Sequence, residues 1–137
     1  MDKAIDPQTW LAQAKIELEV AKHLEQEFRP KPLEIICFHA QQTAEKAIKA
    51  VILYSVPQNS IAKTHDISFL LNSIAKDKYP FEEYFYDYAD ELFPYSVATR
   101  YPNMLQDSID EYKTLQALNH AEEILHWAID AIQMDAR

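Results

Sequence analysis

Hydrophobic residues recur along the chain with the spacing of helix faces, and prolines mark breaks between the helical stretches. The first stretch follows Asp6 and Pro7, where an aspartate can cap a helix and a proline fits its first turn. Apolar residues then return three, four or seven positions apart, which predicts an amphipathic helix that ends near Pro30. They are Leu11, Ala14, Leu18, Ala21 and Phe28.

The stretch from about Leu33 to Tyr54 carries two apolar surfaces. A helix that is apolar on more than one side is usually central in its bundle, so we expect this one at the centre. Its apolar rows are Ile36, Ala40, Ala44, Ala47, Val51 and Tyr54, and Ile35, Phe38, Ile48 and Ile52. Its one polar stripe consists of His39, Gln42, Lys46 and Lys49. Glu45 and Lys49 also have the i,i+4 spacing of a stabilising ion pair.

Shorter helical stretches follow. Thr64 is expected to cap a short helix over residues 67–74. Residues 81–93, FEEYFYDYADELF, predict a helix with its rings on the inner side. These rings exceed what one short helix face can bury, so some belong either in an interface or in a bulky corner of the core. Ser108 and Glu111 have the spacing of a capping box for the last helix.

The predicted elements define the fold class. We expect an all-α protein, an antiparallel up-down four-helix bundle with an extra short helix, because no stretch reads as a strand. A chain of 137 residues usually forms one core, and we see no repeat or linker, so residues 1–137 are expected to form a single domain. Glycine is absent, which excludes glycine-rich phosphate-binding loops of the Walker and dinucleotide types.

Composition also limits the cellular setting. No stretch approaches the roughly 20 apolar residues that cross a bilayer, and the first residues lack the apolar core of a secretory signal. We therefore expect a cytoplasmic protein that does not enter the membrane. The single cysteine, Cys37, cannot form an intrachain disulfide or a cysteine-based zinc site alone. Its apolar neighbours predict a buried, unreactive thiol.

The net charge of −9 is unevenly distributed. Residues 79–137 contain twelve acids and three bases, whereas residues 31–78 carry a small positive excess. This balance argues against duplex DNA as a partner, since phosphate neutralisation dominates that affinity. Glu123 and His126 form the one E-x-x-H pair, and a di-metal bundle needs two such pairs, so we expect no metal site and a surface ion pair instead.

Several polar residues lie in apolar surroundings, where side chains need hydrogen-bond partners. They are Gln42, Glu45, Lys46, Lys49, His65, Asp66, Arg100 and Tyr101. In one interpretation they satisfy each other and fix the packing of the helices. In the other they line a cleft where Arg100, Lys46 or Lys49 meets a phosphate and Tyr101 stacks on a base.

Three segments together resemble the HEPN domain: CFHAQQTAEKAIKAVIL, KTHDISFLL and YADELFPYSVATRYP. They occur in the family's order, and the resemblance covers about residues 8–134. It implies a helical bundle that is usually a homodimer. It further implies a minimal nucleotidyltransferase as partner in a toxin–antitoxin-like pair, and other relatives are linked to nucleotide binding.

Many HEPN proteins are metal-independent ribonucleases with an arginine followed, after four to six residues, by a histidine. Histidine transfers the proton and arginine stabilises the phosphate charge. This chain departs from that pattern, because positions 105–107 after Arg100 are Leu, Gln and Asp. Residues 100–102 instead match the RYP variant of the family, from which a binding role follows.

We therefore expect a non-catalytic homodimer that binds a nucleotide or another anion, acts with a minimal nucleotidyltransferase and needs no metal or cofactor. The predicted ligand-binding residues are Arg100, Tyr101, His65, Lys49, Lys46, Glu45 and Gln42. Two alternatives stay open. One is a divergent ribonuclease in which His65 approaches Arg100 from another helix. The other is a purely structural interaction module whose acidic face over residues 82–91 docks a basic partner.

Overall fold

The computed structural model describes residues 6–55, 62–97 and 109–135, and in these ranges its regular elements are all helical. The α-helices are α1 (Pro7–Glu27), α2 (Leu33–Ser55), α3 (Ile67–Asn72), α4 (Tyr84–Leu92) and α5 (Glu111–Asp135). A 3-10 helix, η1 (Phe93–Val97), continues α4. No helix in the described ranges combines the length and hydrophobicity that crossing a bilayer requires.

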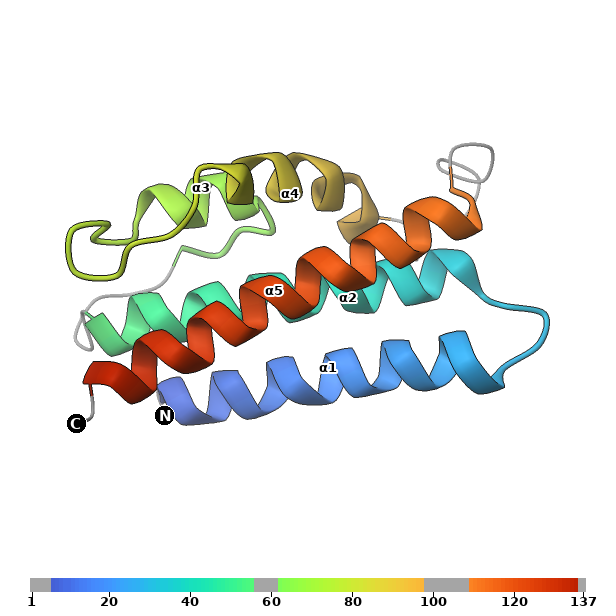
Figure 1. The fold of residues 1–137 in the computed structure, drawn as a ribbon, viewed down its shortest axis with the longest axis horizontal. Coiled ribbons are helices and arrows are strands. Elements are labelled where there is room, and N and C mark those ends of the chain that lie inside the picture. The colour runs from blue at the N-terminus through green and yellow to red at the C-terminus, as the bar shows by residue number, and fades with distance from the viewer. Residues whose placement is uncertain (1–5, 56–61, 98–108, 136–137) are drawn as a thin grey trace.

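The three long helices, α1, α2 and α5, lie alongside one another, and α3 and α4 cover the side of α2 and α5 that faces away from α1 (Figure 1). Along the chain, α1 and α2 run in opposite directions, α4 returns, and α5 runs back beside α2 (Figure 1). The fold is therefore the predicted up-down bundle, with α4 as its short third member and α3 as the extra helix.

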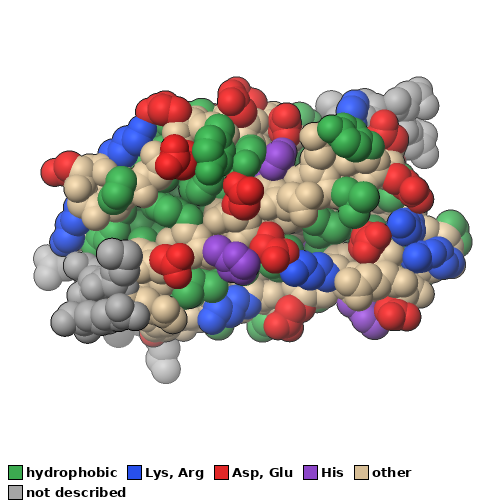
Figure 2. Space-filling view, in the orientation of Figure 1, with side chains coloured by type: hydrophobic (Ala, Val, Ile, Leu, Met, Phe, Trp, Pro, Cys, Tyr) green, Lys and Arg blue, Asp and Glu red, His purple; other side chains and the backbone are tan. Residues whose placement is uncertain are grey.

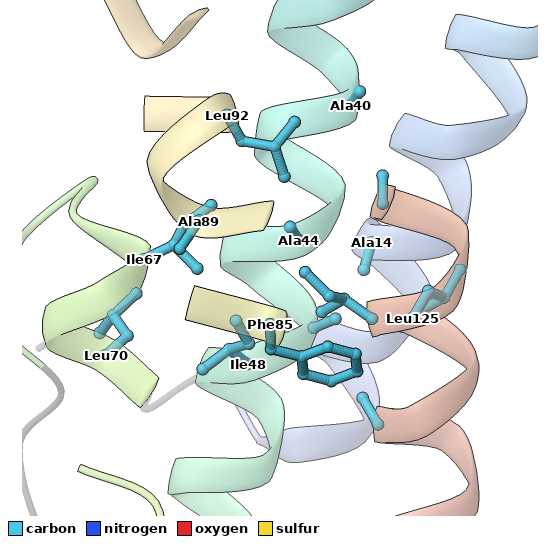
Figure 3. Close-up of a cluster of buried hydrophobic side chains, with 14 of the residues drawn as sticks. Ala14, Ala40, Ala44, Ile48, Ile67, Leu70, Phe85, Ala89, Leu92 and Leu125 are labelled. Atoms are coloured by element: carbon cyan, nitrogen blue, oxygen red, sulfur yellow. The ribbon is translucent and has the colours of Figure 1, made fainter. Parts of the chain in front are cut away.

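Helix α2 is the centre of the bundle, as its two apolar surfaces predict, because it contacts α1, α3, α4, α5 and η1. Small side chains allow the close approach: Ala14 of α1 and Ala40 and Ala44 of α2 are fully buried. Across the bundle, residues of α3 and α4 converge on α2 in one apolar cluster (Figure 3). Ile35 departs from the predicted row and is exposed, since it lies in the first turn of α2.

The cap of α3 differs from the sequence prediction. The side chain of Asp66, rather than Thr64, caps α3 by accepting from the Phe69 amide at 3.2 Å. At α5, Oδ1 of Asp110 accepts from the Lys113 amide at 2.7 Å. An aspartate directly before the first helical residue makes the capping bond and also places its charge at the positive end of the helix dipole. Ser108, the predicted cap of α5, lies outside the described residues.

The aromatic rings of α4 are only partly buried. Phe85 is buried as predicted, but Tyr84 of α4 and Phe93, the first residue of η1, are 46% and 47% exposed. The prediction of inward-facing rings is therefore wrong for these two. A helix of nine residues has room for few large side chains on its inner face, so the remaining rings extend over the surface.

Candidate functional site

The polar stripe of α2 is covered by α1 along part of its length. Glu17 of α1 accepts two hydrogen bonds from α2: one from His39 Nδ1 at 2.7 Å and one from Lys46 Nζ at 2.8 Å. Sequence reasoning did not single out Glu17. Its position three residues after Ala14 and four before Ala21, at the edge of the buried stripe of α1, was the signal that could have identified it.

The second centre of the site is Glu45, which is almost fully buried. Its Oε2 accepts from Lys49 Nζ at 2.9 Å, which confirms the predicted i,i+4 pair. Its Oε1 accepts from Gln41 Nε2 at 3.1 Å and contacts His65 Nδ1 at 2.8 Å. One carboxylate thus joins helix α2 to the residue just before the cap of α3.

Electrostatics keep Glu45 ionised. Burial raises the pKa of its carboxyl group, but the hydrogen bonds from Lys49, His65 and Gln41 outweigh burial, and the pKa lies below its ordinary value of 4.5. An ionised carboxylate can only accept, so Nδ1 of His65 is the donor in this contact. The side chain of His65 is 46% exposed, and its other ring nitrogen, Nε2, is left for a further partner.

Gln41 extends the same network and is another residue that sequence reasoning missed. It is fully buried, donates to the main-chain oxygen of His65 at 3.3 Å, and accepts from Gln42 Nε2 at 2.8 Å. Its place beside Ala40 in a buried row, four residues before Glu45, was the available signal. In the described part of the chain, every buried side-chain nitrogen and oxygen has a hydrogen-bond partner.

The predicted ligand-binding residues are therefore partly assembled. Gln42, Glu45, Lys49 and His65 share one network, and Lys46 belongs to the neighbouring Glu17 cluster. Lys49 is 8% exposed, and its ammonium also lies 5.4 Å from the ring centroid of Trp10. Arg100 and Tyr101 lie outside the described residues. We call the Glu17 and Glu45 clusters together the α2 polar layer.

Within the α2 polar layer, the negative charges of two carboxylates are matched by the positive charges of two ammonium groups. The two ion pairs are Glu17 with Lys46 and Glu45 with Lys49. The mutual pairing that the sequence allowed is thus observed for the described members, and their role in ligand binding stays a prediction.

Metal binding and thiol chemistry were the other candidates that the sequence raised. The described residues contain no group of three His, Cys, Asp or Glu side chains that could hold a metal ion. Glu123 accepts from the Tyr88 hydroxyl at 2.7 Å instead of forming the predicted ion pair with His126. The thiol of Cys37 is buried and hydrogen-bonded to Thr114 at 3.6 Å, and burial raises its pKa to about 11, as expected of an unreactive cysteine.

A family model and two solved structures are similar to this chain. The model of the HEPN domain matches residues 7–132. The crystal structure of TT1696 from Thermus thermophilus is 27% identical, with a TM-score of 0.77, over 93% of this chain and 99% of that chain. The archaeal HEPN homologue ST0689 is 25% identical, with a TM-score of 0.69, over 93% of this chain and 98% of that chain. No curated protein matches the sequence.

Proposed function

The chain belongs to the HEPN domain family, and from this membership we propose that it is a non-catalytic module that binds a nucleotide or another anion. In this proposal it works as a cytoplasmic homodimer with a minimal nucleotidyltransferase, in a toxin–antitoxin-like pair. The ligand lies at the solvent-facing edge of the α2 polar layer.

The observation that carries the proposal is that His65 is held by Glu45 and is still exposed to solvent. A buried, ionised carboxylate fixes one nitrogen of the ring, while nearly half of the side chain faces solvent. A fixed imidazole presents its second nitrogen, Nε2, in one direction at little entropic cost, and in the doubly protonated ring this nitrogen donates a hydrogen bond to a phosphate oxygen. Lys49, which donates to the same carboxylate, adds a positive charge to the site.

Arg100 and Tyr101 complete the proposed site. A guanidinium group recognises phosphate with two parallel hydrogen bonds, and a tyrosine ring offers a surface on which a base stacks. Binding is favoured over catalysis because the chain lacks a histidine four to six residues after Arg100. Glu45, Gln42 and Lys46 act in this proposal by orienting the groups that contact the ligand.

Isothermal calorimetry with ATP and AMP at two salt concentrations tests the proposal. We expect saturable binding that weakens with salt, and a dissociation constant raised at least tenfold in His65→Ala and in Arg100→Ala. The matched control is His23→Ala, because His23 is an exposed histidine on α1 and its removal leaves the α2 polar layer intact. No binding by the wild type, or equal losses in the control, would contradict the proposal.

The pair of Glu45 and His65 also favours a second candidate, a divergent ribonuclease. A carboxylate that orients a histidine is a common arrangement for proton transfer, which contributes about 10²–10⁴-fold to rate. Incubation with labelled RNA tests this candidate. Cleavage that is lost in His65→Ala and kept in His23→Ala supports it, and intact RNA with the wild type excludes it.

The pairing of every buried polar side-chain atom in the described ranges favours a third candidate, a purely structural interaction module. Here Arg100→Ala gives the distinguishing result. If the module is structural, this variant changes the free energy of unfolding and no nucleotide alters the unfolding of either protein. If the module binds nucleotides, ATP raises the melting temperature of the wild type and not of the variant.

A further inference from the structure

A pocket of about 490 Å³ opens between the segment that leads into α4, the first turn of α4 and the middle of α5. Its walls combine aromatic rings with acidic side chains. The residues that matter here are Phe81, Tyr84, Trp127, Glu82, Glu123 and Asp130. Over α4 and the adjoining part of α5, hydrophobic side chains are bordered by acidic ones (Figure 2). We call this feature the acidic aromatic pocket.

The aromatic wall is held in place. The indole Nε1 of Trp127 donates to the main-chain oxygen of Pro80 at 2.8 Å, which joins α5 to the segment before α4. The Trp127 ring packs nearly perpendicular to Phe81 and to Phe85, with ring centroids 5.8 Å apart in both pairs. Tyr84 is the most exposed of these rings. Because aromatic faces carry partial negative charge, such a wall attracts cations.

The acidic side chains of the pocket have carboxylate oxygens that are free to bind a ligand. Glu82 and Asp130 are exposed, and neither carboxylate has an ion-pair or hydrogen-bond partner in the described ranges. Glu123 accepts from Tyr88 through one oxygen only. Of the charged groups at the pocket, three carboxylates line it, against His126 in the lining and Lys76 beside the Phe81 ring, so acidic groups outnumber basic ones there.

We propose that the acidic aromatic pocket binds an arginine side chain from a basic segment of a partner protein. A guanidinium group is planar, so it stacks on an aromatic ring while its edge donates to a carboxylate. The chain itself contains a related pairing beside the pocket: Lys76 Nζ lies 4.8 Å from the Phe81 ring centroid and pairs with Glu83.

The charge of the pocket favours an arginine side chain over a nucleic acid, a metal ion or a second copy of this chain. Phosphate groups of nucleic acids are repelled by three carboxylates, and the described residues, those of the pocket included, contain no group of three His, Cys, Asp or Glu side chains placed to hold a metal ion. A second copy of this chain has a net charge of −9 and is poorly suited to a negative surface. The proposal does not depend on the nucleotide site, because α2 contributes no residue to the pocket.

The test uses an acetylated and amidated peptide with two arginines separated by small neutral residues, titrated into ¹⁵N-labelled protein. We expect saturable shifts of the Trp127 indole signal and of the amides of residues 81–84 and 126–130. In the double variant Glu82→Gln/Asp130→Asn, we expect the dissociation constant to rise at least fivefold. The matched control is Glu19→Gln/Glu27→Gln, which removes the same charge from exposed positions on α1.

A second control separates guanidinium recognition from general attraction. A peptide with citrulline in place of arginine keeps the shape of the side chain and loses its charge, so it is expected not to bind. Three results would overturn the proposal: no localised shifts at millimolar arginine peptide, equal affinities of the two double variants, or equal binding of the citrulline peptide.

Discussion

Glu45 and His65 meet through Oε1 and Nδ1 at 2.8 Å, across twenty positions of sequence, and this contact attaches the start of α3 to the centre of α2. Gln41 strengthens the attachment through the main-chain oxygen of His65. Asp66, the next residue, caps α3. The network of Glu45 therefore fixes where α3 begins, in addition to placing the imidazole that we propose for ligand binding.

Replacement of Glu45 by glutamine is expected to lower the free energy of unfolding by about 3 kcal/mol, because Lys49 then keeps a buried charge without its counterion. Urea denaturation measures the loss. The double variant Glu45→Gln/Lys49→Met should regain part of it, since both charges are then absent. A single variant as stable as the wild type would show that the pair contributes nothing to stability.

Stability is expected to fall in acid. The pKa values of Glu45 and Glu17 are both lowered in the folded state: burial raises each, and hydrogen bonds from the paired cations outweigh it. Carboxyl groups of this kind stabilise the fold above their ordinary pKa of 4.5, and the contribution is lost as the pH falls through the lower folded values.

Unfolding by urea between pH 3 and pH 6 tests this expectation. The wild type should lose stability as the pH falls below about 4.5, and Glu17→Gln/Glu45→Gln should show a shallower dependence. Identical slopes in the two proteins would mean that other carboxyl groups control acid unfolding.

Cys37 is expected to resist thiol reagents until the chain unfolds. Its pKa of about 11, against an ordinary 9.0, reduces the thiolate fraction about a hundredfold, and burial blocks access as well. The reaction with Ellman's reagent at pH 8 should therefore be slow in buffer and fast in urea. Because the chain has a single cysteine, the signal reports this position alone. Fast reaction of the folded protein would contradict the burial.

Ala44 is expected to tolerate no larger side chain. It is fully buried on α2 within the central apolar cluster (Figure 3). Ala44→Leu should cost about 1–3 kcal/mol through overpacking. Ala12→Leu, at an exposed position of α1, is the matched control and should change stability by less than about 0.5 kcal/mol. Thermal unfolding of the two variants side by side gives the comparison.

Asp110 is expected to stabilise α5 as its cap. Asp110→Ala should lower the free energy of unfolding by about 1 kcal/mol, because the Lys113 amide loses its acceptor. Asp110→Asn should stay close to the wild type, since an amide oxygen accepts the same bond. Equal losses in the two variants would assign the effect to the charge of the aspartate and not to the cap.

The sequence predicted the helices well because their signals are local. The bounds of α2 and the pairing of Glu45 with Lys49 follow from periodicity and i,i+4 spacing, which a single helix determines. The cap of α3 was placed less well, because threonine and aspartate compete for the same role and both occur just before the helix starts.

The partners of the site residues could not be predicted. Glu17 meets His39 and Lys46 across 22 and 29 positions, and Gln41 meets His65 across 24. Such contacts depend on how two helices are aligned, and periodicity identifies a face without giving that alignment. The partial exposure of Tyr84 has the same origin, since it depends on what packs over α4.

The buried alanines of α1 and α2 are small and alike, so they do not by themselves fix how the two helices are aligned. If one helix were shifted by a full turn, the interface would still bury apolar surface. Such a shift would move Glu17 by about 5.4 Å, away from His39 and Lys46. These three side chains would then lose their hydrogen-bond partners between the helices. The contacts of Glu17 therefore select one alignment of α1 and α2 from the several that apolar packing alone would allow.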